Sequence, residues 1–271
     1  MSILAGVIGD PISHSRSPRL HGHWLRRYGI DGHYVPFHVT AADLPAALDL
    51  LPRLGVVGIN VTIPHKEAVF AAAHDVTERA RAVGAANTLT FRDGRIHADN
   101  TDGYGFIANL DQVAPTRTKS APALVLGAGG AARGVIAALL ADGTPQVTLT
   151  NRTRARAETL AQEFGSAVRV LDWDESADAL ADHGLLVNTT SLGMAGQPPL
   201  DLSLDRLPPE TVVTDIVYTP LETPLLLEAR ARGNTAVDGL GMLLHQALPG
   251  FERWFGIRPD VDEDLRQVML R

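Results

Sequence analysis

A glycine-rich turn near the middle of the chain constrains its fold more than any other segment. Residues 123–133 read Ala-Leu-Val-Leu-Gly-Ala-Gly-Gly-Ala-Ala-Arg. A short apolar run ends at Gly127, turns through Gly129 and Gly130, and leads directly into an alanine-rich stretch. A strand, a glycine turn and a helix in this order present backbone N–H groups at a helix N-terminus, where a pyrophosphate binds. The sequence therefore predicts a dinucleotide-binding turn, preceded by a separate segment of the chain.

Composition limits the partners of the 271-residue chain. The net charge of -7 disfavours nucleic acid and anionic membranes, which bind basic surfaces. The absence of cysteine excludes disulfides, thiolate metal sites and cysteine nucleophiles. The apolar run Ile3–Ile8 is too short to span a membrane, and no basic segment precedes it as in a signal peptide. We therefore expect a soluble, cytoplasmic protein.

Strands and helices alternate after the glycine turn, which indicates a parallel sheet with helices on both faces. At Thr223-Pro224 a hydroxyl side chain precedes a proline, as is typical of a helix start. The expected strands are 147–150, 185–188, 212–217 and 235–237, and a helix is expected at 154–164.

The first hundred residues predict a second α/β unit. Asp93-Gly94 is a hairpin turn signal between two strands. A polar, proline-flanked linker is expected at 111–122, and a cleft between two such domains is the default ligand site. The expected strands are 3–8, 34–38, 58–61, 88–92 and 95–98, and the expected helices are 17–28, 43–54, 65–73 and 77–83.

Three arginines follow the second strand of the nucleotide module, where NAD-binding domains usually have an acidic residue. The segment reads Asn151-Arg-Thr-Arg-Ala-Arg156. Guanidinium groups pair well with phosphate oxygens, so the cluster favours the 2′-phosphate of NADP. The alternative, an exposed basic helix start, is unusual because cations oppose the helix dipole there. We therefore predict NADP rather than NAD.

Lys66 is the main candidate for proton transfer. It ends the segment Asn60-Val-Thr-Ile-Pro-His-Lys66, and the chain has one other lysine, Lys119. Most lysines only face solvent. Lysine can nevertheless transfer a proton at neutral pH, whereas arginine cannot. A lysine among many arginines therefore suggests acid–base chemistry.

Other polar residues have a structural alternative beside a functional one. Ser15 and Ser17 offer two hydroxyls from one loop, which suits a carboxylate or a polyol, although Ser17-Pro18 also fits a helix cap. The segment 99–102, Asp-Asn-Thr-Asp, equally fits an Asx turn. A helix expected from Gly239 would place Met242 and Gln246 on one face, where such residues more often serve packing or solubility. The histidines lack metal-ligand spacing, and no Gly-x-Ser-x-Gly motif occurs, so we expect neither a metal site nor a serine hydrolase.

Seven motifs, in this order, closely resemble those of the shikimate dehydrogenase family. Each motif alone is weak, but together they span residues 6 to about 255. The motifs are His14-Ser-Arg-Ser-Pro18, Asn60-Val-Thr-Ile-Pro-His-Lys66, Ala85-Ala-Asn87-Thr, Asp99-Asn-Thr-Asp102-Gly, Gly127-Ala-Gly-Gly-Ala131, Asn151-Arg-Thr153 and Asp238-Gly-Leu-Gly-Met-Leu243.

The resemblance implies NADPH-dependent reduction of 3-dehydroshikimate to shikimate, a step toward chorismate and the aromatic amino acids. By motif match, Lys66 is the general acid–base, and Asp102 holds its ammonium and also binds a ring hydroxyl. The family also implies a discontinuous substrate-binding domain of residues 1–102 and 240–271, with a mainly parallel sheet, and a Rossmann-type NADP-binding domain of residues 103–239. Whether the protein forms a homodimer stays open.

The resemblance also assigns binding residues. For the substrate they are Ser15 and Ser17 at the carboxylate, Thr62, Asn87 and Gln246 at the ring hydroxyls, and Tyr218. For the cofactor they are Gly127, Ala128, Gly129, Gly130 and Ala131 at the pyrophosphate, Asn151, Arg152, Thr153 and Arg156 at the 2′-phosphate, Ile216, Gly239 and Met242 at the nicotinamide, and Glu78. Thr189 departs from the family, which usually has a small residue there, and we expect its hydroxyl near the nicotinamide.

Two alternatives are kept. A quinate/shikimate dehydrogenase that uses NAD commonly has an acidic residue at the position of Arg152 and a threonine at that of Ser17, so both residues argue against it. A non-catalytic NADP-binding regulator would be favoured by loss of Lys66 or Asp102, and both are present.

Overall fold

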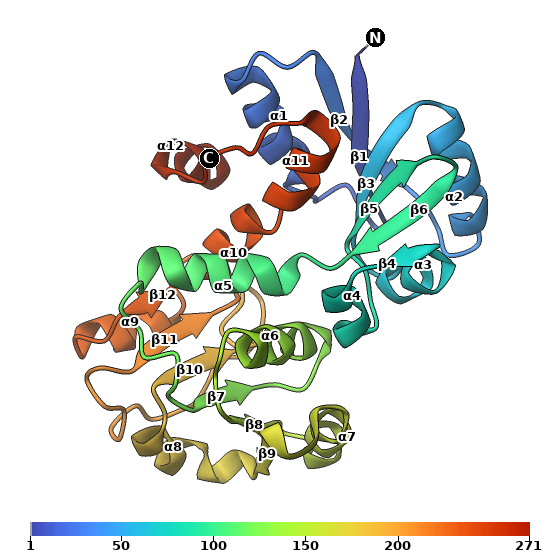
Figure 1. The fold of residues 1–271 in the computed structure, drawn as a ribbon. Helices are drawn as coiled ribbons and strands as arrows, with labels where there is room; N and C mark the ends of the chain where they lie inside the picture. Colours follow the sequence, from blue (N-terminus) through green and yellow to red (C-terminus); the bar gives the residue numbers. More distant parts are fainter. Residues whose placement is uncertain (1) are drawn as a thin grey trace. The chain divides into compact units, whose positions relative to one another are not determined.

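The computed structural model describes residues 2–271 and divides into two compact units. The first unit consists of the chain up to Tyr104 together with Leu244–Arg271, and the second is Gly105–Leu243. Each unit contains a six-stranded sheet, mostly parallel in the first and wholly parallel in the second (Figure 1). The predicted mixed α/β class with two sheets is confirmed.

The first unit has the strand order β2-β1-β3-β5-β6-β4. β3 pairs with β5, and β5 with β6, in the antiparallel sense, whereas the other pairs are parallel. Its elements are β1 (Ile3–Gly9), α1 (Ser17–Arg27), β2 (Gly32–His38), α2 (Leu44–Arg53), β3 (Val56–Val61), α3 (Lys66–Ala72), β4 (Asp75–Val76), α4 (Glu78–Val83), β5 (Thr88–Arg92), β6 (Arg95–Asp99), α11 (Leu248–Phe255) and α12 (Glu263–Leu270).

The predicted hairpin turn joins β5 and β6. Arg92 and Arg95 pair across it, and Asp93 and Gly94 both have positive φ, 53° and 70°. This is the backbone of a type I′ turn, which Asp-Gly favours. β5 runs antiparallel to β3, and β6 runs antiparallel to β5. The start of β5 and the end of β6 therefore lie at the edge where the parallel strands β1 and β3 end.

The two faces of the first sheet are covered differently (Figure 1). Leu48 of α2 and Val69 of α3 pack on one face, against Ile8 and Ile59. On the other face α1 and α11 meet, where the rings of Trp24 and Phe251 are 5.1 Å apart. Both faces are therefore buried, which accounts for the near-continuous apolar strands.

The second unit has the strand order β12-β11-β10-β7-β8-β9. This is the order of a doubly wound nucleotide-binding fold, in which β7 and β10 flank the point where the winding reverses. Its elements are β7 (Ala123–Leu126), α6 (Gly130–Ala141), β8 (Val147–Thr150), α7 (Arg154–Phe164), β9 (Val168–Leu171), α8 (Ser176–Ala179), β10 (Leu185–Asn188), β11 (Val212–Asp215), α9 (Pro224–Ala231) and β12 (Ala236–Val237), with short 3₁₀ turns at Gly165–Ala167, Trp173–Glu175 and Leu180–Asp182.

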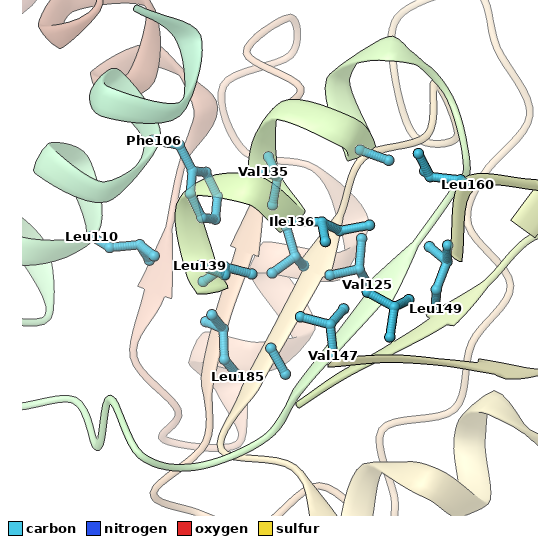
Figure 2. Packing of buried hydrophobic residues seen from close by; sticks show 14 of the residues in the cluster. Phe106, Leu110, Val125, Val135, Ile136, Leu139, Val147, Leu149, Leu160 and Leu185 are labelled. Atoms are coloured by element: carbon cyan, nitrogen blue, oxygen red, sulfur yellow. The ribbon is translucent and has the colours of Figure 1, made fainter. Parts of the chain in front are cut away.

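Alternate side chains of β7 enter separate cores. Val125 packs with Val135 and Ile136 of α6 (Figure 2), whereas Leu124 and Leu126 belong to the core under α9. These three residues of β7 are fully buried. The strand is therefore fixed on both faces, and the glycine turn that follows it has a rigid support.

Two helices, located in the sequence where the chain passes from one unit to the other, differ from the sequence prediction. α5 (Asp102–Val113) occupies the start of the expected linker, so the prediction was wrong for residues 111–113. Buried Phe106, Leu110 and Ala114, spaced by four residues, were the missed helical signal, because Gly103 and Gly105 obscured it. α10 (Gly239–His245) ends one residue before Gln246. The structure also adds β4, β9, α8, α11 and α12, which were not predicted.

A buried carboxylate joins three elements of the first unit. Asp99 of β6 is 1% exposed and accepts hydrogen bonds from Arg79 of α4, from Thr77, and at 2.6 Å from Arg253 of α11. Burial alone would raise its pKa, but the Arg79 hydrogen bonds and charge, with Thr77 and Arg253, outweigh burial and lower the pKa to about 2. This carboxylate therefore anchors the end of β6, three residues before Asp102.

We expect Gly58→Ala to destabilise the protein by about 1–3 kcal/mol, because a Cβ there would lie 1.9 Å from Nε1 of the buried Trp254. Gly22→Ala is the control in the same unit, since its Cβ would meet only the end of Arg26 at 3.4 Å. Urea unfolding of both variants measures the difference. Equal stability of the two variants would contradict the packing argument.

We expect Asp99→Asn to lower the free energy of unfolding by about 2–3 kcal/mol at pH 7, because it breaks a buried charge cluster. The stabilisation by Asp99 is present above its unfolded-state pKa of 3.8 and is lost as the pH falls toward about 2. The difference between the variant and the wild type should therefore shrink between about pH 4 and pH 2 in urea titrations. The exposed pair of Asp75 with Arg95 is the control, and Asp75→Asn should have a smaller effect. A pH-independent difference for Asp99 would refute this account.

Candidate active site

Lys66 and Asp102 form an ion pair in the first unit. Lys66 Nζ donates to Asp102 Oδ2 at 2.6 Å, and the two side chains are 30% and 28% exposed. Each residue begins a helix, α3 and α5 respectively. The helix dipole favours a carboxylate at that position and disfavours an ammonium, so Asp102 offsets the unfavourable position of Lys66. The pair is open enough to meet a ligand.

Local structure fixes both ends of this pair. The Lys66 carbonyl accepts from the Ala86 amide at 2.9 Å, and the preceding buried His65 lies 2.6 Å from the Val39 carbonyl through Nε2. The Asp102 amide donates to Asn100 Oδ1 at 3.1 Å. The Asx turn considered from the sequence is therefore present, and it orients Asp102.

Asn87 and Gln246 join the pair. Asn87 Nδ2 donates to Asp102 Oδ1 at 2.8 Å and to Gln246 Oε1 at 3.3 Å. Gln246 lies in the turn between α10 and α11 and not within a helix, which corrects the prediction. Four of the sequence-predicted residues are thus brought together within one unit.

The predicted carboxylate-binding residues lie at the same edge of the first sheet. Ser15 and Ser17 follow β1, and Thr62 follows the neighbouring parallel strand β3. Ser15 Oγ accepts from the Ser17 amide at 3.3 Å, while Arg16 and not a serine precedes α1 as its N-cap, without a side-chain cap. The helix-cap alternative is therefore not observed. Glu78, in contrast, is exposed in the first turn of α4 and bonds to none of these residues.

Sequence reasoning missed the polar groups behind Asn87. Tyr34 OH donates to Asn60 Oδ1 at 2.7 Å, and Asn60 Nδ2 donates to Thr88 Oγ1 at 3.1 Å. Burial raises the pKa of Tyr34 well above its usual value, with a smaller opposing effect of Ser17. The ring of Tyr34 stacks on His21 at 3.9 Å, and burial lowers the pKa of this histidine to about 3. Polar residues inside predicted buried strands were the available signal.

The glycine turn of the second unit has the features that a pyrophosphate requires. Gly127 has φ of 102°, and a Cβ on it would lie 2.8 Å from Thr189 Oγ1, so no larger residue fits. A Cβ on Gly129 or Gly130 would meet nothing within 4 Å, and both residues are exposed at the start of α6. The turn thus offers open space at a helix N-terminus, as a phosphate group needs.

The arginines after β8 are not equivalent. Arg154 pairs with Glu158 at 2.8 Å and with Asp172 at 2.5 Å. Arg152 and Arg156 are exposed and form no ion pair with any other residue of 2–271. Asn151 connects this segment to the glycine turn, because its Oδ1 accepts from the Ala128 amide at 3.2 Å and its Nδ2 donates to the Thr153 carbonyl at 2.9 Å. Two cations are therefore available to a phosphate beside the turn.

Residues at the other side of the switch point pack closely. A Cβ on Gly239 would lie 2.3 Å from the Ile216 carbonyl oxygen, which requires glycine. Ile216 and Met242 are partly buried against the core that contains Val125, and Tyr218 is half-buried. Thr189 Oγ1 donates to the Leu126 carbonyl at 2.7 Å, so its hydroxyl serves the glycine turn.

A buried carboxylate supports these strand ends. Asp215 accepts from Asn188 at 3.1 Å, from the Val217 amide at 3.0 Å and from Thr223 at 2.8 Å. Burial raises its pKa, and these hydrogen bonds oppose the shift. Asp215 thus joins β10, β11 and the start of α9.

Among residues 2–271, no helix is both long and apolar enough to cross a membrane. No group of three or more His, Cys, Asp or Glu side chains there is arranged to hold a metal ion.

Comparison with known families covers most of the chain. Residues 7–89 match the shikimate dehydrogenase substrate binding domain. Residues 110–194 match shikimate / quinate 5-dehydrogenase, and residues 239–269 match the shikimate 5'-dehydrogenase C-terminal domain. All three matches point to the same family.

Individual relatives point to the same family as the domain matches. The shikimate dehydrogenase (NADP(+)) of Jannaschia sp. (strain CCS1) is 62% identical over 98% of this chain and 97% of its own length. The crystal structure of shikimate 5-dehydrogenase from Thermus thermophilus, in complex with NADP(H) and shikimate, has a TM-score of 0.87 and 36% identity over 99% of each chain. Quinate dehydrogenase from Corynebacterium glutamicum, in complex with NAD, has a TM-score of 0.92 and 32% identity over 99% of each chain. The chain therefore belongs to the shikimate dehydrogenase family.

Proposed function

We propose that this enzyme catalyses the reversible, NADPH-dependent reduction of 3-dehydroshikimate to shikimate on the pathway to the aromatic amino acids. The ion pair of Lys66 with Asp102, held by Asn87 at one edge of the first sheet, is the observation that carries the proposal. The NADP(+)-dependent relatives at 60–62% identity support the cofactor and the substrate. The quinate alternative is not favoured, since Arg152 and Ser17 also argue against it.

Lys66 acts as the acid–base group. Bound NADPH supplies the hydride to the carbonyl carbon. The Lys66 ammonium donates a proton to the oxygen as negative charge develops there, and in the reverse direction the amine removes it. Asp102 holds the ammonium at 2.6 Å and directs it.

The remaining groups bind the substrate. We assign the substrate carboxylate to the hydroxyls of Ser15 and Ser17, which share one loop. Thr62, Asn87 and Gln246 bind ring hydroxyls, and Asp102 accepts from one of them. Tyr218 completes the set. The assignment of the residues in the first unit is supported by their position at one edge of the sheet, which β1, β3, β5 and β6 share. The assignment of Tyr218 is supported by motif similarity.

The second unit holds the cofactor. We assign the pyrophosphate to the turn 127–131 at the start of α6, and the 2′-phosphate to Asn151, Arg152, Thr153 and Arg156. Ile216, Gly239 and Met242 border the nicotinamide. Glu78 is assigned to the cofactor by motif similarity alone. The open space at Gly129 and Gly130 fits such a ligand.

The proposal includes three broader features. Residues 1–102 and 240–271 form the substrate-binding domain, and residues 103–239 form the NADP-binding domain. The enzyme acts in the cytoplasm and forms a homodimer. Sedimentation equilibrium tests the dimer, and cell fractionation tests the location.

One assay separates the candidate functions. NADPH and NADH oxidation is followed at 340 nm with 3-dehydroshikimate and with 3-dehydroquinate. We expect turnover mainly with NADPH and 3-dehydroshikimate. Comparable rates with 3-dehydroquinate and NADH would indicate the broader enzyme, and NADPH binding without any turnover would indicate a regulator.

Lys66→Ala should lower kcat by roughly 10²- to 10⁴-fold, because it removes the proton donor, with a smaller effect on substrate binding. The second lysine provides the control, since Lys119 pairs with Asp142 at 2.8 Å on the surface. Lys119→Ala should keep wild-type turnover in steady-state assays. Near-normal kcat for the Lys66 variant would remove this residue from the mechanism.

Arg152→Asp should shift the preference toward NADH, because it replaces an exposed cation at the assigned 2′-phosphate site with the residue type typical of NAD sites. The ratio of kcat/KM for NADPH and NADH measures the shift. Arg154→Asp is the comparison, and its effect should be smaller because Arg154 is held by Glu158 and Asp172. An unchanged ratio for Arg152→Asp would place the 2′-phosphate elsewhere.

A further inference from the structure

We propose that the hydroxyls of Thr88 and Thr101 are positioning groups that fix the side-chain amide of Asn87, and thereby keep Asp102 an ionised acceptor beside Lys66. The proposal rests on the proposed function, because turnover is one of its readouts. It assigns a task to two buried residues that the reaction itself does not use.

The orientation of the Asn87 amide follows from an unambiguous donor. The backbone N–H of Thr101 can only donate, and it lies 2.9 Å from Asn87 Oδ1. The hydroxyls of Thr101 and Thr88 donate to the same oxygen at 3.0 and 2.9 Å. Three donors therefore converge on one atom, so the NH₂ group must face the other way.

The hydrogen bonds behind Thr88 run in the same direction. Asn60 Nδ2 donates to the Asn87 carbonyl at 3.2 Å, which identifies it as the amide nitrogen. The same nitrogen donates to Thr88 Oγ1 at 3.1 Å. Because Thr88 accepts there, its own proton is available to Asn87. Tyr34 OH donates to the remaining oxygen of Asn60 at 2.7 Å.

The orientation of the Asn87 amide determines which group faces Asp102. Its Oδ1 accepts from Asn87 Nδ2 at 2.8 Å, and its Oδ2 accepts from Lys66 Nζ at 2.6 Å. Both carboxylate oxygens of Asp102 accept a hydrogen bond, so protonation of either oxygen would break one of these bonds. Asp102 is therefore fixed as an acceptor at both oxygens, and Lys66 Nζ is the donor that faces it. A reversed Asn87 amide would instead turn its oxygen toward Asp102 and toward Gln246 Oε1, two acceptors.

Burial makes the hydrogen bonds from the Thr88 and Thr101 hydroxyls hard to replace. Thr88 and Thr101 are 0% exposed and Asn87 is 3% exposed, so water cannot replace a missing donor. The two threonine hydroxyls also lie within 3.3 Å of each other. They act on one oxygen, and their removal should not be additive.

The test replaces each hydroxyl by a methyl group of similar size. Thr88→Val and Thr101→Val should each lower kcat about 10-fold, the usual worth of one buried hydrogen bond, while the KM for NADPH stays constant. Thr88→Ser and Thr101→Ser should restore most of the loss, since serine keeps the hydroxyl. Thr90→Val is the control on the same strand, because Thr90 accepts from Trp254 Nε1 at 3.3 Å and does not bond to Asn87. Equal losses in the serine and valine variants would show packing to be the cause and overturn the proposal.

A second readout does not depend on activity. The chain has two lysines, Lys66 and Lys119, so reductive ¹³C-methylation gives lysine NMR signals that Lys66→Ala assigns. We expect the pH titration of the Lys66 methyl signal to shift in the valine variants, with that of Lys119 unchanged. An unmoved Lys66 titration would overturn the positioning role. If the variants show these shifts and the wild-type protein does not turn over 3-dehydroshikimate, the proposed function alone is refuted.

Discussion

The ion pair between Lys66 and Asp102 is the interaction on which the proposed catalytic site in the first unit depends. An ammonium in the first turn of a helix is electrostatically unfavourable, and a carboxylate in the same position is favourable. The structure sets the two first turns, of α3 and α5, side by side through a contact of 2.6 Å. The cation is thus held by its partner and not by its own helix. Asn87 Nδ2 then donates to the second carboxylate oxygen at 2.8 Å, so both oxygens of Asp102 have a donor.

The topology of the sheet makes this pair possible. In a purely parallel sheet the segment that starts a strand lies at the edge opposite to the one where strands end. Here β5 and β6 form an antiparallel hairpin, so Asn87 before β5 and Asp102 after β6 lie at the same edge of the sheet. Ser15 follows β1 and Thr62 follows β3 at this edge. The buried Asp99, bonded by Arg79 and Arg253, fixes the end of β6 to two helices. Rigidity at this point is what holds Asp102 in reach of Lys66.

Sequence reasoning succeeded where a local signal was strong. The strands 88–92 and 147–150, the turn Asp93-Gly94 and the helix start at Thr223-Pro224 are as predicted, because hydrophobic period, turn chemistry and capping each act over a few residues. It failed at α5, where two glycines masked a helix that tertiary burial stabilises. The pairing of Lys66 with Asp102 came from family resemblance, since no local rule joins residues 36 apart in sequence. The direction of the hydrogen bonds from Tyr34 to Asp102 depends on which N–H or carbonyl faces each amide, so it needed the three-dimensional structure.

The arginine segment shows how the structure refines a composition argument. Arg152, Arg154 and Arg156 are equivalent in sequence as candidates for a 2′-phosphate. Arg154 is held by two carboxylates, so a phosphate would have to displace an existing partner to use it. The other two cations are exposed and without such partners among residues 2–271, so they can bind a phosphate without that loss. Asn151 bonds both to the Ala128 amide and to the Thr153 carbonyl, so the segment is positioned from the glycine turn itself. The segment proposed for the 2′-phosphate and the turn proposed for the pyrophosphate are therefore linked through the Asn151 side chain, whereas the proposed acid–base pair of Lys66 and Asp102 lies within the other unit.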